Sequence, residues 1–246
     1  ADQLGVDIIQ NVITQEDGNE LKAEALFVRA LIYYHLVRLF GEVPYISSVD
    51  FGDPTSITKQ SVNEVYTNII EDLEFAYDHL PMKHLGGLRS RPSKGAAATM
   101  LASVYMTREN WTEAYNYSKW VIDNATELEY GLENDFQDLW RADMISGLNE
   151  YIFFVDFLGD QRGGGNPITL ENDQTLGAFN SVDGGIAPHN GWSMLVPSEL
   201  VYTTWDPADY RRAVSIDAER ILSDGILHDY VDFKIPRPHA AKFNRF

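Results

Sequence analysis

The most constraining feature of this sequence is a regular repeat of apolar residues between positions 62 and 80. Apolar side chains recur there at intervals of three and one, and the charged and amide residues fall on the opposite face. This spacing matches the 3.6-residue period of an amphipathic α-helix rather than the two-residue period of a strand. Ser61 and Glu64 have the spacing of a capping box at the start of the segment, and Pro81 stops it. The chain is therefore expected to be built mainly on α-helices.

Other segments support the same expectation. Residues 21–40 are apolar on nearly every face, which is typical of a helix packed on several sides. Residues 94–107 are rich in alanine, so another helix can approach closely. Residues 111–124 form a further expected helix, capped by Asn110. Its core-facing stripe is predicted to be Trp111, Ala114, Tyr115, Ser118, Val121 and Ile122, so that Trp111 and Trp120 count as packing residues.

The last two of these helices carry part of a tetratricopeptide signature. Leu101-Ala102-x-x-Tyr105, with Ala114 nine residues on, fits positions of that 34-residue helix hairpin. An ordinary pair of antiparallel helices would show the same small residues for the same packing reason. We expect a mainly α fold of tetratricopeptide-like helix hairpins in a right-handed superhelix, followed by a loop-rich irregular second half with a few short strands.

The character of the chain changes after residue 125, where Gly, Asn, Asp and Pro become frequent. Helical periodicity is weak and confined to the regions near 133–140 and 197–213, while residues 151–158 alternate in a way that suits a strand. We interpret residues 1–246 as a single, truncated domain belonging to a longer protein. Within it, residues 20–125 would form the tetratricopeptide-like helical part and residues 126–246 a loop-rich, ligand-binding part.

Composition and motifs exclude several functions. A net charge of -18 would repel a nucleic-acid backbone, and the absence of cysteine removes disulfides and thiolate metal sites. No apolar stretch is long enough to span a membrane, because charged residues and a histidine interrupt residues 25–40. The six histidines lack metal-ligand spacing, and no paired-carboxylate or nucleophile motif stands out. The sequence therefore predicts no cofactor, no metal and no enzymatic activity.

Residues 23–44, which read AEALFVRALIYYHLVRLFGEVP, resemble the hallmark of the SusD/RagB family. Ser-Val-x-Glu-Val-Tyr at 61–66, Lys94-Gly95-Ala96-Ala97 and Asp135-Phe136-x-Asp138-Leu139-Trp140 follow in the family's order, so the similarity covers most of residues 20–245. The resemblance implies a surface lipoprotein of the outer membrane. Such a protein captures oligosaccharides without turnover and passes them to a SusC-like TonB-dependent transporter. Because the chain has no cysteine, any lipid anchor would lie upstream of these residues.

A site for a neutral sugar needs an aromatic platform flanked by hydrogen-bonding side chains. The loop carrying His189, Asn190 and Trp192 offers both and is the first candidate; alternatively, Trp192 fills a gap in the core. A second candidate is Asp160-Gln161-Arg162, next to three glycines that would let the backbone approach a ligand, although the same loop could be a mobile surface segment.

Two other functions remain open from the sequence. A tetratricopeptide adaptor would hold a peptide in its helical groove and would need basic residues on the inner faces, where only Arg89, Arg91 and Lys94 are near. A glycoside hydrolase would need two carboxyl groups at a defined separation, which is a spatial property that sequence does not give.

Overall fold

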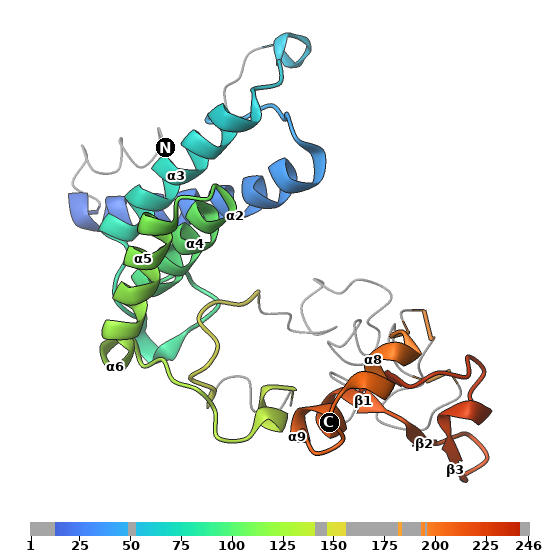
Figure 1. Cartoon of the computed structure of the whole chain (residues 1–246). Helices are drawn as coiled ribbons and strands as arrows, with labels where there is room; N and C mark the ends of the chain where they lie inside the picture. The colour runs from blue at the N-terminus through green and yellow to red at the C-terminus, as the bar shows by residue number, and fades with distance from the viewer. Residues whose placement is uncertain are drawn as a thin grey trace. The chain divides into compact units, whose positions relative to one another are not determined.

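The structure is a computed structural model that describes residues 13–48, 53–140, 147–155, 182–183, 193–194 and 196–241. The chain divides into two compact units. One comprises residues 1–131 together with 151–154, and the other comprises residues 132–150 and 155–246. The first is helical and the second is irregular, as Figure 1 shows.

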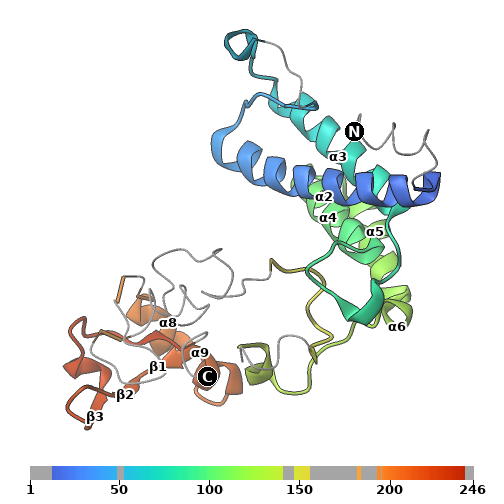
Figure 2. The ribbon, with the colours of Figure 1, turned by 180° about the vertical axis from the view of Figure 1, so that it is seen from behind.

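Among its described residues the helical unit has four long helices: α2 (Gln15–Phe40), α3 (Val62–His79), α4 (Lys94–Thr107) and α5 (Trp111–Asp123). Each packs on the next along the chain, α2 on α3, α3 on α4 and α4 on α5, and the same stacking is visible from behind in Figure 2. The described part of the unit also contains the short helix α6 (Ala125–Leu128) and the 3-10 turns η1 (Pro54–Ser56) and η2 (Leu85–Gly87). The mainly helical, tetratricopeptide-like fold predicted from the sequence is confirmed.

The helix starts follow the capping residues. Ser61 and Glu64 form the expected capping box of α3, and Asn110 accepts a hydrogen bond from the Glu113 amide at the start of α5. The predicted start of α2 at residue 21 was wrong, because the helix begins six residues earlier. Thr14 and Asp17 make a capping box there, with aspartate in the place that glutamate or glutamine usually takes.

The core of this unit lies where α2, α3 and α4 meet. Phe27 of α2, Ile69 and Leu73 of α3, and Leu101 of α4 are completely buried. Small residues bring the helices together, since Ala97 and Ala98 of α4 are also fully buried. The alanine-rich sequence of α4 therefore acts as expected, as a surface for close helix packing.

A partly buried polar group joins α2 to α3 beside this core. The Arg29 side chain of α2 donates from Nε (2.7 Å) and Nη2 (2.6 Å) to the Asp72 carboxylate of α3. The Tyr45 hydroxyl also donates to Asp72. Burial, followed by this hydrogen bond to a carboxylate, raises the pKa of Tyr45 well above its usual value. The three side chains thus tie the two helices and the loop between them at one point.

Two sequence predictions fail in the helical unit. Residues 151–155 were expected to begin a strand, but the described part of that segment is not in a strand. It packs against the helical core instead: the Phe153 ring lies edge-to-face on Phe27 at 5.1 Å, and the Phe154 amide donates a hydrogen bond to the Arg89 carbonyl. Alternating aromatic residues here serve core packing because the partner surface is a helix bundle, not a neighbouring strand.

The predicted stripe of α5 was also wrong in part. Ala114 is buried and the Trp120 ring packs on Tyr77 of α3, as expected. Trp111, Tyr115 and Ile122 are exposed instead, and Tyr117, which was not in the predicted stripe, packs on α3 and α4. The helix has aromatic residues on both faces, so its apolar periodicity did not specify which face is buried.

The second unit contains short elements only. Its described helices are η3 (Phe136–Trp140), α8 (Glu199–Thr204), α9 (Tyr210–Ser215) and η6 (Tyr230–Asp232). Its described strands form two antiparallel pairs, β1 (Ile216–Asp217) with β4 (His239–Ala240) and β2 (Glu219–Ile221) with β3 (Leu227–Asp229). The few short strands expected in the second half of the chain are present. In the part of the chain that the structure describes, no helix combines the length and apolarity that crossing a bilayer requires.

Candidate functional site

The predicted sugar-binding residues lie outside the described residues. This holds for His189, Asn190 and Trp192 of the first candidate loop and for Asp160, Gln161 and Arg162 of the second. The structure therefore neither brings these side chains together nor separates them, and their role stays a prediction.

The residue immediately after Trp192 is described, and it is firmly anchored. Ser193 is nearly buried and holds a left-handed backbone conformation, with φ of 50°. Its hydroxyl accepts a hydrogen bond from the Asp183 amide (2.9 Å) and bonds to Nε2 of His239 (2.8 Å). The end of the candidate loop is thus held in place by buried polar contacts.

His239 is completely buried, and its two ring nitrogens have different roles. Nδ1 lies 2.8 Å from the Arg237 carbonyl, which can only accept, so Nδ1 carries the proton and Nε2 accepts from the Ser193 hydroxyl. Burial lowers the pKa of His239, which keeps the ring neutral as this arrangement requires. The Ser193–His239 pair resembles the serine nucleophile and histidine base of a hydrolase. Both groups are buried, however, and their effect is to position the chain after Trp192.

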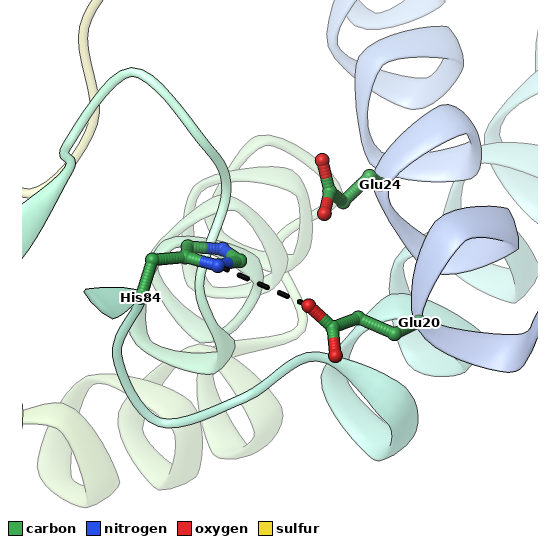
Figure 3. A group of neighbouring side chains, drawn as sticks. All are labelled: Glu20, Glu24 and His84. Carbon is green, nitrogen blue, oxygen red and sulfur yellow. Dashed lines mark ion pairs between the residues drawn. The ribbon is translucent and has the colours of Figure 1, made fainter. Parts of the chain in front are cut away.

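A different polar group gathers in the helical unit, where α2 meets the loop that follows α3. Glu20 and Glu24 are one turn apart on α2 and so point from the same face. His84 faces them from the loop, as Figure 3 shows, with its Nδ1 3.9 Å from Oε1 of Glu20. One donor atom from each of these residues lies within 4.8 Å of the others. We call Glu20, Glu24 and His84 the carboxylate–histidine cluster.

Arg91 is the counter-ion of this cluster. Its guanidinium pairs with the Glu24 carboxylate, and Nη2 also lies 3.7 Å from Oε1 of Glu20. A small pocket beside it is lined by Lys83, His84, Arg89 and Arg91, among others. Sequence spacing offered no signal for this arrangement, because His84 follows Glu24 by 60 positions and only the packing of the loop on α2 brings them together.

Comparison with known proteins identifies the family. A SusD-like family model, described as "starch-binding associating with outer membrane", matches residues 5–106. A SusD-like protein of Formosa agariphila is 39% identical over 239 residues, a match that covers 93% of this chain and 46% of that protein. The chain belongs to the SusD-like family. A second SusD-like protein of the same bacterium is 29% identical, and 47% of its length is covered. The chain spans about half the length of the curated relatives it matches.

Solved structures share the fold of this SusD-like chain. A laminarin-binding SusD-like protein superposes with a TM-score of 0.73 at 20% identity, covering 94% of this chain and 53% of that one. A surface glycan-binding protein A from Bacteroides uniformis gives a TM-score of 0.72 at 18% identity, with 95% and 49% covered. Similarity at this level of identity establishes the fold alone. The family resemblance seen in the sequence is confirmed by the family model and by the 39% identity to the Formosa agariphila protein.

Proposed function

We propose that this SusD-like chain is part of a protein that binds oligosaccharides at the outer membrane without cleaving them. The observation that carries the proposal is the 39% identity to a SusD-like protein, in a family described as starch-binding and associated with the outer membrane. The laminarin-binding and glycan-binding proteins of the same fold agree with it. By extension, the full-length protein would be a surface-exposed lipoprotein that hands its ligand to a SusC-like TonB-dependent transporter.

The proposed mechanism is stacking of a sugar ring on Trp192, with hydrogen bonds from Asn190 and His189 and a contribution from the Asp160-Gln161-Arg162 loop. The anchoring of Ser193 supports this choice, because it fixes the backbone next to the aromatic platform. Such a site gives affinities of about millimolar to micromolar, roughly -4 to -8 kcal/mol, which suit a protein that must release its ligand.

The contacts of the basic residues disfavour a peptide-binding adaptor. Lys94 lies over the Tyr77 ring at 4.4 Å, Arg89 donates to the Glu129 carbonyl at 2.7 Å, and Arg91 pairs with Glu24. Each of the three cations that could grip a peptide carboxylate is therefore already engaged within the chain. Glycoside hydrolysis remains the competing activity to be tested.

Titration calorimetry with laminarin and starch oligosaccharides tests the proposal. The Trp192→Ala variant is expected to lose about 2 kcal/mol of binding free energy, which is roughly a 30-fold weaker Kd. Trp111→Ala is the matched control, because Trp111 is 64% exposed on α5 and its loss should leave both fold and binding unchanged. Equal affinity in the Trp192→Ala variant would remove Trp192 from the site. Release of reducing sugar from these glycans would overturn the non-catalytic assignment.

A further inference from the structure

The carboxylate–histidine cluster contains a buried histidine ring that has one nitrogen turned toward Glu20. The His84 side chain is only 4% exposed, and its Nε2 lies 2.8 Å from the Pro92 carbonyl. A carbonyl can only accept, so Nε2 must carry the proton, and in the neutral ring Nδ1 presents a lone pair. That lone pair points toward the carboxylate of Glu20, another acceptor, at 3.9 Å. An imidazole lone pair and a carboxylate oxygen that face each other can share a cation placed between them.

The arrangement of His84 is also that of a metal ligand. Histidines that bind metals usually donate their other ring N–H to a carbonyl or carboxylate, which fixes the tautomer and turns the free nitrogen toward the ion. The Pro92 carbonyl does this for His84. One imidazole and two carboxylates are a donor set that divalent zinc accepts, with a water molecule as the fourth ligand.

We propose that Glu20, Glu24 and His84 form a binding site for a divalent transition-metal ion, for which zinc fits best. A tetrahedral zinc ion with bonds of about 2.1 Å holds its donor atoms roughly 3.4 Å apart. The donor atoms here lie within 4.8 Å of one another, so each must move by about 1 Å or less to reach that spacing. The two glutamate side chains are 34% and 21% exposed and can make this movement by rotating their terminal torsions.

Arg91 sets how tightly the site binds the ion. In the metal-free chain it neutralises the carboxylates of Glu24 and Glu20 from one side. Its own side chain is 44% exposed, so it can swing into solvent when a divalent cation takes its place. The metal ion and the Arg91 guanidinium are both positive and repel each other. Arg91 therefore competes with the ion for the two carboxylates and lowers the metal affinity.

The consequence of metal binding is a cross-link within the helical unit. Glu20 and Glu24 belong to the first half of α2, whereas His84 belongs to the loop between α3 and α4. An ion that binds all three in the folded state, and not in the unfolded chain, raises the stability of that unit. The site shares no residue with the proposed sugar site, so either proposal can fail without the other.

Zinc titration of the chelator-treated chain by calorimetry tests the site, with the melting temperature as a second readout. The wild-type chain is expected to bind one zinc ion and to melt at a higher temperature with it. Losing a residue that only hydrogen-bonds to a metal ligand lowers metal affinity about 10–100-fold. Glu20 is itself a proposed ligand, so Glu20→Gln should lower zinc affinity at least as much. Arg91→Ala should instead tighten binding, by roughly tenfold if the displaced charge stays about 6 Å away.

Controls separate a specific site from stray binding. Glu20→Gln keeps the size of the side chain and is tested together with His84→Gln, which replaces a buried residue. Circular dichroism checks that both variants fold. His79→Ala is the matched control, since it removes an exposed histidine near the end of α3. Wild-type binding weaker than about 1 mM, or binding that only His79→Ala reduces, would overturn the proposal. So would zinc affinity that is the same in wild type, Glu20→Gln and Arg91→Ala.

Discussion

Replacing Asp72 with asparagine should strongly destabilise the helical unit. The Asp72 side chain is 8% exposed, and its carboxylate receives two hydrogen bonds from Arg29 and one from Tyr45. Asparagine has nearly the same shape, but it removes the charge and turns an amide N–H₂ toward other donors. The substitution therefore leaves the Arg29 guanidinium without its counter-ion.

The magnitude follows from burial. Removing one partner of a buried ion pair costs about 3–5 kcal/mol, because the remaining charge stays buried without compensation. The Arg29 side chain is 25% exposed, so water partly solvates the guanidinium and lowers the cost to the bottom of this range or just below it. We expect a loss of about 2–3 kcal/mol in the free energy of unfolding.

Urea denaturation followed by circular dichroism at helical wavelengths measures this loss. Asp123→Asn is the control, because Asp123 pairs with Lys119 on the surface of α5 and both side chains are about half exposed. An exposed pair one turn apart contributes about 0.3–0.5 kcal/mol. If Asp72→Asn and Asp123→Asn differed by less than about 0.5 kcal/mol, the reasoning from burial would be refuted.

Replacing both partners offers a second check on the same reasoning. Apolar side chains of similar volume need no counter-ion, so the Arg29→Met/Asp72→Leu double variant is expected to be more stable than Asp72→Asn alone. Lower stability in the double variant would mean that Asp72 acts through something other than the charge on Arg29.

Two further outcomes follow from the packing of the helical unit. Phe27→Ala should lower the free energy of unfolding by about 3–5 kcal/mol in the same urea experiment. The reason is that Phe27 is fully buried and its ring packs edge-to-face with Phe153. Burial, together with the nearby Glu74 charge, raises the pKa of Tyr117 to about 12. The folded chain therefore keeps the Tyr117 proton at pH values where the unfolded chain has lost it, and stability should fall as pH rises from about 10 to about 12. Tyr117→Phe should flatten part of that decline in melting temperature, and an unchanged profile would contradict the assigned cause.

Local sequence alone determined the helices and the family. The apolar spacing in α3 and the caps at Ser61 and Asn110 depend on residues within one or two helical turns. Local sequence is therefore enough to predict these helices and where they begin. The hallmark over residues 23–44 identified the SusD-like family for a similar reason, because it is a long uninterrupted match. The one misplaced start, at α2, came from a capping box closed by Asp17 rather than by a longer acidic side chain.

Only the tertiary structure decided which surfaces meet. Aromatic residues on both faces of α5 left its orientation open in the sequence; in the structure Tyr117 packs on α3 and α4, and Trp111 is exposed. The segment around Phe153 reads as a strand in isolation, but it packs on Phe27 because a helical surface is what lies beside it. The prediction that the chain binds no metal used only the spacing of histidines in the sequence. The carboxylate–histidine cluster forms because the loop with His84 packs against α2, 60 positions after Glu24. Contacts of this kind arise from packing between distant segments, which short-range periodicity does not encode.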